Sequence, residues 1–204
     1  MPKSFTEKES EQIRKTLMIK GKELFSIAGL RKTTVDDLVR SAGIAKGSFY
    51  KFFPCKEILY LEILEEIETN IRSSMATANL EGKELTKEGI KAFLSDIITS
   101  IDENPILLKM FDEKALELIM RKIPQERIEK HRENDSKWFV GLFKSWQNEG
   151  YLPETDEDVF SAVLRSVFIL FTQKEVIGND LFLPTMDLLF DFIAAGIIDS
   201  REAK

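Results

Sequence analysis

Apolar residues recur at helical spacing along most of the chain. Near the amino terminus, Thr6 is followed three residues later by Glu9, which is the pattern of a capping box at the start of a helix. The apolar residues Ile13, Leu17, Leu24 and Phe25 follow at helical spacing. The pattern predicts a first helix that ends around Gly29, because glycine tolerates the left-handed conformation found after a helix.

Two short helices are predicted next. Thr33-Thr34 is a suitable cap for the first of them, and the helix ends near Gly43. The second runs from Ala45 to Phe52, where the following Pro54 interrupts the helical pattern.

The rest of the chain has the same periodicity over longer stretches. A long fourth helix is predicted from Lys56, because isoleucines and leucines recur every three or four residues as far as Ile71. Further helices are expected at about Lys87–Asp102, Pro105–Arg121, Pro124–Asn148, Asp156–Ile177 and Pro184–Ile198. The sequence contains no alternating strand pattern, glycine-rich phosphate loop or fixed-period repeat, so the fold class is all-α.

Composition excludes several kinds of active site. The single Cys and the single His among 204 residues rule out a disulfide framework, a cysteine-rich metal cluster and a multi-histidine metal site. A Ser–His–Asp triad could still be drawn with His131, but the sequence offers no catalytic constellation with a recognisable spacing. We therefore expect no metal, no cofactor and no catalytic residues, and the protein is not predicted to be an enzyme.

The sequence also argues against export and membrane insertion. The amino terminus lacks the apolar core of a signal peptide, and the stretch Val159–Phe171 is interrupted by Arg165. That stretch, which we take as the most apolar in the chain, is shorter than the roughly 20 residues of a bilayer span. A cytoplasmic protein without membrane contact is expected.

The net charge of −6 is divided unevenly. Residues 1–60 contain twelve Lys and Arg against seven Asp and Glu, a balance of +5, and the remaining residues have a balance of −11. A basic amino-terminal part suits a polyanion such as nucleic acid. An ordinary fluctuation in surface charge is the alternative.

Residues 33–53 have the form of a helix-turn-helix. One small core is expected from Val35, Leu38, Val39, Ala42, Ile44 and Phe49. Such a core directs the second helix outward, where it fits a major groove. Side chains of this second helix that suit phosphates or base edges are Lys46, Ser48, Tyr50 and Lys51, and Gly47 permits close approach of the backbone.

Three blocks of this region resemble the amino-terminal domain of TetR-type transcriptional regulators. They are Thr33–Val39, Ala42–Tyr50 and Phe53–Glu57, at nearly gap-free spacing within residues 10–60. The resemblance implies an all-α homodimer with a DNA-binding domain at 1–55 and a ligand-binding and dimerisation domain at 56–204. Members of that family usually act as repressors that a small molecule releases.

The resemblance also implies which residues meet DNA. These are Thr33, Thr34, Lys46, Gly47, Ser48, Tyr50, Lys51 and Lys56. Two positions depart from the family pattern: Ala45 stands where a hydroxyl residue is frequent, and Cys55 where a Ser-like cap is frequent.

Aromatic residues mark the expected effector region. Trp138, Phe139, Leu142, Phe143 and Trp146 form one broad face of the helix predicted to follow Pro124. Such a stripe is usually core, but in this family effectors bind between helices of this kind, and large rings suit a flat or apolar molecule. The candidate effector contacts are Met110, Phe111, Trp138, Phe139 and Phe143.

Several other residues have a structural and a functional interpretation. Phe49 and Phe53 suit the local core better than base stacking, whereas Tyr50 suits either role. Cys55 is interpreted as a passive small residue rather than a redox sensor, and His131 as a solvated surface residue rather than a ligand or base.

The last two predicted helices are apolar around much of their circumference, which a two-fold dimer bundle would cover. The main hypothesis is a dimeric regulator that binds a near-palindromic DNA operator and is released by a small apolar or aromatic effector. The alternatives are a helical protein–protein adaptor and a small-molecule-binding protein without sequence-specific DNA binding.

Overall fold

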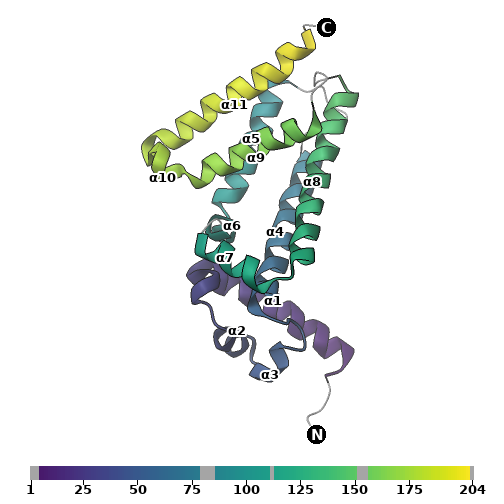
Figure 1. Ribbon diagram of the computed structural model, residues 1–204, viewed down its shortest axis with the longest axis vertical. Helices are drawn as coiled ribbons and strands as arrows, with labels where there is room; N and C mark the ends of the chain where they lie inside the picture. The colour runs from purple at the N-terminus through teal and green to yellow at the C-terminus, as the bar shows by residue number, and fades with distance from the viewer. Residues whose placement is uncertain (1–4, 79–85, 111–112, 151–155, 203–204) are drawn as a thin grey trace. The chain divides into compact units, whose positions relative to one another are not determined.

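The fold is described from a computed structural model covering residues 5–78, 86–110, 113–150 and 156–202. Those residues are helical with short connections and contain no strand, so the all-α prediction is confirmed. Figure 1 labels the helices, which are α1 (Glu7–Lys32), α2 (Val35–Ala42), α3 (Lys46–Phe49), α4 (Lys56–Ala78), α5 (Lys87–Asp102), α6 (Pro105–Met110), α7 (Glu113–Lys122), α8 (Gln125–Asn148), α9 (Glu157–Thr172), α10 (Lys174–Ile177) and α11 (Asn179–Glu202).

The chain divides into two compact units. The first combines residues 1–69 with 104–128, and the second combines 70–103 with 129–204. Both α4 and α8 contribute residues to each unit. These two units are defined by how the helices pack. The boundary expected at residue 56 separates a DNA-binding domain from a ligand-binding and dimerisation domain, and it stays a prediction.

Helix α1 begins and ends where the sequence pattern predicts. The Thr6 side chain accepts a hydrogen bond from the Glu9 backbone N–H, and the Glu9 side chain accepts one from the Thr6 N–H, which completes the capping box. Gly29 has a φ of 73° and breaks the regular helix, after which one more short turn reaches Lys32. A side chain at position 29 would be strained in this conformation.

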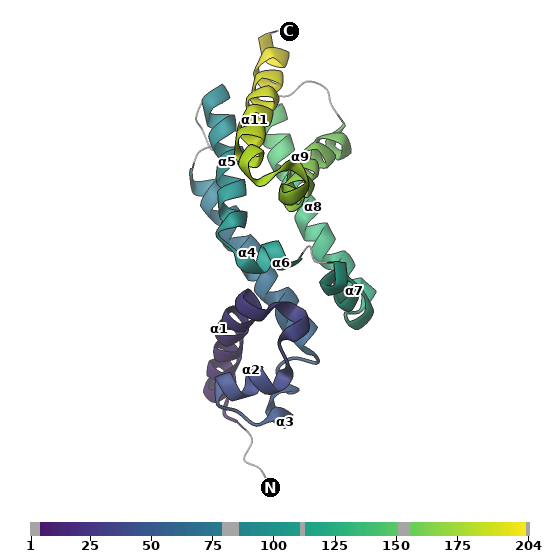
Figure 2. The ribbon, with the colours of Figure 1, turned by 90° about the vertical axis from the view of Figure 1, so that its left-hand side faces the viewer.

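The α2–α3 segment forms one end of the first unit in both views (Figures 1 and 2). Helix α2 ends at Gly43, whose φ of 67° is left-handed. Helix α3 is shorter than expected, ending at Phe49 instead of Phe52. The reason is local: Phe53 is buried in the core, and Pro54 disfavours a helical conformation in the residue before it.

Helices α1 and α4 approach closely at a glycine. A Cβ built on Gly21 would lie 2.9 Å from a terminal carbon of Ile63 and 3.2 Å from one of Leu59. Nearby, the Phe25 and Tyr60 rings meet edge to face at 5.0 Å, and the Tyr60 hydroxyl donates to the Ile106 carbonyl. The core of the first unit therefore ties the start of α4 firmly to α1.

Other helix boundaries agree in part with the sequence pattern. Helix α5 has the predicted bounds, and the predicted span Pro105–Arg121 contains α6 and α7, with residues 111–112 between them outside the described residues. The span Asp156–Ile177 is divided at Gln173, which has a non-helical φ/ψ of −99° and 22°. Helix α11 begins at Asn179, so Pro184 lies inside the helix instead of in the predicted first turn.

In the second unit, α5 and α11 lie side by side (Figure 2). Helix α11 buries Phe182, Met186, Phe190 and Ala194. On its adjacent face, the Lys91 ammonium of α5 lies 2.8 Å from Asp187 and 2.9 Å from Asp191. The apolar and charged contacts together fix the register of the two helices.

The outer surfaces of the last helices remain apolar. Exposed large apolar side chains on α9 and α11 are Val159, Val163, Ile169, Leu170, Leu181, Leu183, Leu188 and Phe192. Within Asn179–Asp199, an 18-residue window has a mean hydropathy of 1.8, and the span is long and apolar enough to cross a membrane by length and composition alone. Only Val159–Phe171 is considered as a possible bilayer span in the sequence analysis, because the last helix is expected there to begin at Pro184 and not at Asn179. Core helices of soluble proteins have the same length and composition.

Candidate nucleic-acid interface and effector-binding core

A small apolar core holds the helix-turn-helix together. The side chains of Leu38, Phe49 and Phe53 are fully buried, and Val39 is nearly so. The Phe49 and Phe53 rings lie 5.9 Å apart, which confirms the interpretation of both as core residues. With Phe49 turned inward, the neighbouring Lys46, Gly47 and Tyr50 lie on the exposed side of α3.

The exposed side of α3 carries cations and one large phenol. Tyr50 is 53% exposed, and Ser48 is half-buried. The Lys46 ammonium lies 2.9 Å from the Asp36 carboxylate of α2. This contact raises the pKa of Lys46 further, so the ammonium stays charged. Lys51 follows α3, and its ammonium lies 5.2 Å from the centre of the Phe5 ring, a cation–π contact.

Thr34 begins α2 with a second capping box. Its hydroxyl accepts from the Asp37 backbone N–H at 3.1 Å and donates to the Asp37 carboxylate at 2.6 Å. The Thr34 backbone N–H donates to the same carboxylate at 3.0 Å. These hydrogen bonds from Thr34 lower the pKa of Asp37.

The Thr33 side chain has an internal position. Its side chain is 2% exposed, and its hydroxyl donates to the Gly29 carbonyl at 2.8 Å. The hydroxyl thereby satisfies a carbonyl left over at the end of α1. The Thr33 side chain is thus part of the core of the first unit, and the predicted contact of Thr33 with DNA stays a prediction.

Lys56 also has an internal role. Its ammonium donates to the carbonyls of Leu30 and Thr33 at 2.7 and 2.6 Å. Burial lowers the pKa of this half-buried amine. Lys56 thus links the start of α4 to the end of α1, and its predicted contact with a DNA phosphate stays a prediction.

Cys55 precedes α4 at the position where the family frequently has a cap residue. The thiol is half-buried, and burial raises its pKa. A raised pKa keeps the sulfur protonated and less reactive. The observation favours the passive role over the redox role.

Sequence analysis missed an open groove in the first unit. It has a volume of about 420 Å³ and runs between α1 and α4. Its apolar side chains are Met18, Ile19, Ile63 and Ile67. Ile19 is exposed at this groove, but one exposed apolar residue is common on protein surfaces. The sequence pattern therefore gives no clear signal for the groove.

The predicted effector residues fall into three situations. Phe139 and Phe143 are buried in the second unit, whereas Trp138 is half-buried beneath the Arg72 guanidinium, 5.8 Å from the ring centre. Met110 ends α6, and its side chain lies outside the described residues, as does Phe111 altogether. The structure thus brings together three of the five candidates on α8.

The same core contains polar atoms that the aromatic pattern did not reveal. Trp146 is 2% exposed, and its ring packs against Phe93 and Phe160 at 5.8 and 5.9 Å between ring centres. Its indole nitrogen has no hydrogen-bond partner within residues 5–78, 86–110, 113–150 and 156–202, and neither has the hydroxyl of the buried Ser161.

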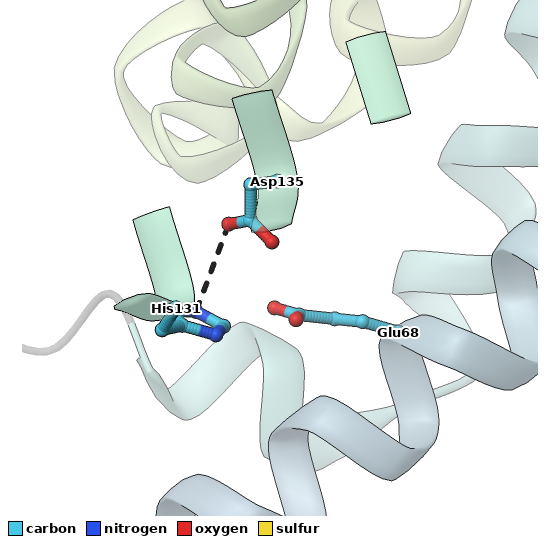
Figure 3. A group of neighbouring side chains, drawn as sticks. All are labelled: Glu68, His131 and Asp135. Carbon is cyan, nitrogen blue, oxygen red and sulfur yellow. Dashed lines mark ion pairs between the residues drawn. The ribbon is translucent and has the colours of Figure 1, made fainter. Parts of the chain in front are cut away.

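His131 differs from its interpretation as a solvated residue. Its side chain is 15% exposed and lies 3.6 Å from the Asp135 carboxylate on the next turn of α8 (Figure 3). Asp135 also pairs with Arg72. Glu68, drawn in the same figure, comes from the part of α4 that belongs to the other compact unit. His131 and Asp135 are two possible metal ligands on α8. A zinc site has three or four protein ligands, so these two residues alone do not form one.

Comparisons with known proteins point to one family. The model of "Bacterial regulatory proteins, tetR family" matches residues 19–63, which contain α2, α3 and the beginning of α4. A curated relative, the nucleoid occlusion factor SlmA of Glaesserella parasuis serovar 5, is 24% identical over 180 residues. That alignment covers 82% of this chain and 87% of the relative.

Solved structures show the same fold over nearly the whole chain. A TetR-family transcriptional regulator from Pectobacterium atrosepticum is 19% identical, with a TM-score of 0.71, over 95% of this chain and 97% of the other. RolR in complex with resorcinol is 17% identical, with a TM-score of 0.62, over 97% of this chain and 95% of the other. The chain therefore carries the amino-terminal helix-turn-helix domain of the TetR family and has the fold of its regulators.

Proposed function

We propose that this protein is a dimeric, ligand-responsive DNA-binding transcriptional regulator of the cytoplasm, and specifically a repressor. The observation that carries the proposal is the arrangement of α3: Phe49 anchors the helix in the core, and Lys46, Gly47 and Tyr50 face outward. An exposed short helix with donors at its amino-terminal end suits the major groove. The role proposed is regulation and not catalysis, in keeping with the regulators it resembles.

Electrostatics support DNA as the partner. The first 60 residues carry a balance of +5 within a chain of net charge −6. Phosphates attract the basic part, and the acidic remainder is repelled from the duplex. Direct contacts are assigned to Thr34, Lys46, Gly47, Ser48, Tyr50 and Lys51, with Lys56 near the backbone.

The exposed apolar surface of α9 and α11 supports a homodimer. Leu188 and Phe192 are more than half exposed on α11, an arrangement that a monomer rarely keeps. A two-fold axis through this surface would bury both copies of it and would pair two α3 helices. Their target is then a near-palindromic operator with half-sites separated by about one helical turn, about 34 Å, or a multiple of it.

The effector is proposed to be a small apolar or aromatic molecule held by the aromatic face of α8. The buried Phe139 and Phe143 supply flat apolar walls for such a ligand. The similar RolR binds resorcinol, an aromatic compound, which agrees in chemistry with these walls.

Two continuous helices offer a route from effector to DNA. Helix α4 starts beside the helix-turn-helix, and the Arg127 guanidinium near the start of α8 forms two hydrogen bonds with the Glu65 carboxylate of α4. A ligand that binds best to one arrangement of these helices changes the operator affinity. A tenfold change in affinity requires about 1.4 kcal/mol of differential binding.

A second candidate function rests on the curated relatives. A nucleoid occlusion factor matches 82% of this chain, so the similarity extends beyond the helix-turn-helix. In that case the protein binds DNA sites in the nucleoid without release by a small molecule. The test is whether any apolar ligand that binds the protein changes its affinity for DNA.

Selection from a random duplex library tests the main proposal. A near-palindromic motif is expected, and an absence of enrichment would contradict sequence-specific binding. With the selected duplex, Lys51→Ala is expected to weaken binding and to make the salt dependence shallower by about one unit of log–log slope, because one phosphate contact is lost. Lys137→Ala removes an exposed charge from α8 and serves as the control that should leave both quantities unchanged.

A further inference from the structure

Two buried hydrogen-bond donors in the second unit lack acceptors among the described residues. The indole nitrogen of Trp146 and the hydroxyl of Ser161 are inaccessible to solvent and have no partner in the part of the chain that the structure describes. Both residues are 2% exposed. An unpaired buried donor is rare in native proteins, and each case calls for a partner such as a water molecule or a ligand.

Their positions place them in one part of the core. Trp146 of α8 packs against Phe160 of α9 at 5.9 Å between ring centres, and Ser161 directly follows Phe160. Phe143 lies 5.1 Å from Phe160 on the same two helices. The Trp146 ring therefore lies among aromatic rings of α5 and α9, and the buried Ser161 is one residue further along α9.

Ser161 is unusual for a serine in a helix. Such hydroxyls commonly bond to the carbonyl four residues earlier, as Ser166 does with Ala162 at 2.8 Å on the same helix. The Ser161 hydroxyl makes no such bond. It is buried, unlike Ser166, and is available to an acceptor from outside the helix.

We infer that Trp146 and Ser161 form the polar end of the effector site and bind an oxygen acceptor on a small aromatic carbonyl compound. This inference rests on the proposed function, because it assigns the ligand to the second unit. The rings of Phe143 and Phe160 favour an aromatic body, and the N–H and O–H donors require an acceptor on it. A neutral carbonyl suits a site where burying a charge is costly.

Acetophenone and α-methylstyrene provide a matched pair of probes, because they differ in having C=O or C=CH₂ at the same position. The chain has two tryptophans, so the ¹⁵N-labelled protein gives two indole N–H signals, which Trp138→Phe and Trp146→Phe assign. Acetophenone is expected to shift the Trp146 signal downfield in a saturable manner. The shift arises because the carbonyl accepts the indole proton, and α-methylstyrene should not cause it.

Substitutions give a second readout. Trp146→Phe and Ser161→Ala are each expected to weaken acetophenone binding about fivefold, the effect of one hydrogen bond, and to leave α-methylstyrene binding unchanged. Ser161→Ala should also raise the Tm of the ligand-free protein, because it removes an unpaired buried donor and leaves almost no cavity. A purely structural role would lower the Tm. Ser166→Ala is the matched control and should leave acetophenone binding unchanged.

Three results would overturn the inference. The first is equal binding of the two probes, and the second is no binding of acetophenone up to its solubility limit. The third is a Trp146 indole N–H that is hydrogen-bonded to an internal water and whose signal does not change when acetophenone is added. Failure of the proposed function is distinguishable, because these measurements need no DNA. If acetophenone binds at Trp146 but does not change the affinity of the protein for the selected duplex, the effector role is contradicted. The assignment of the carbonyl-binding site would still hold.

Discussion

Lys46 and Asp36 connect the two helices of the helix-turn-helix through an ion pair with 2.9 Å between the ammonium and the carboxylate. Both side chains are more than half exposed, so the pair lies at the surface assigned to DNA. Asp36 therefore neutralises one of the cations of that surface while it holds the Lys46 side chain over α2. The sequence shows both residues but not their contact, because ten positions separate them.

Removal of Asp36 should strengthen DNA binding. Asp36→Asn is expected to raise the affinity for duplex DNA several-fold and to steepen its salt dependence by about one unit of log–log slope, because Lys46 becomes available to a phosphate. Fluorescence anisotropy over a salt series measures both quantities. Asp158→Asn changes the same charge at the same position of helix α9 and should have no effect. Weaker binding by Asp36→Asn would show that the ion pair positions Lys46 for DNA.

The capping interaction of Asp37 predicts a pH dependence of stability. Its pKa is lowered in the folded protein by hydrogen bonds from Thr34, so it stabilises the fold above the unfolded pKa of about 3.9. This contribution is lost as the pH falls through the lower, folded pKa. Asp37→Asn should therefore reduce the Tm at pH 6, and the difference should narrow below about pH 4. Thermal unfolding across this range is the measurement, and a constant difference would contradict the electrostatic explanation.

Gly21 and Gly47 are both helical but have opposite surroundings. A Cβ at position 21 would lie 2.9 Å from Ile63, whereas a Cβ at position 47 meets no atom within 4 Å. Gly21→Ala should destabilise the protein by about 1 kcal/mol, because overpacking outweighs the gain in helix propensity. Gly47→Ala should leave the stability of the protein unchanged or raise it. It should nevertheless weaken DNA binding if the backbone approaches the duplex at this point. Chemical denaturation and duplex titration together separate the two effects.

The apolar face of α11 makes a prediction about assembly. Phe192 is 65% exposed, and Phe192→Glu places a charge in the proposed interface. We expect the dissociation constant of the dimer to rise at least tenfold, because burying an unpaired charge is costly. The affinity for the operator should fall as the dimer is lost. Sedimentation velocity at several concentrations checks the first effect. Ile27→Glu introduces the same charge at an 80% exposed position of α1 and should leave the protein dimeric.

Local chemistry explains which elements could be predicted. The capping boxes at Thr6 and Thr34 and the positive φ of Gly29 and Gly43 depend on residues within a few positions of each other. Interactions of this range are visible in a linear pattern. The predicted end of α3 and the predicted start of α11 differ from the structure by three and five residues, and the residues close to both true boundaries, Phe53 and Phe182, are buried.

The amino-acid order alone determined the helical class, the helix-turn-helix segment and its exposed donors, since these follow from periodicity, caps and charge. Tertiary packing decided that Thr33 is internal, that Lys56 caps α1, and that Asp36 holds Lys46. It also decided which rings of α8 are buried and left the Trp146 nitrogen without a partner among the described residues. The physical reason is that hydrogen bonds, ion pairs and burial between distant residues depend on which side chains meet in space, and sequence spacing does not record that.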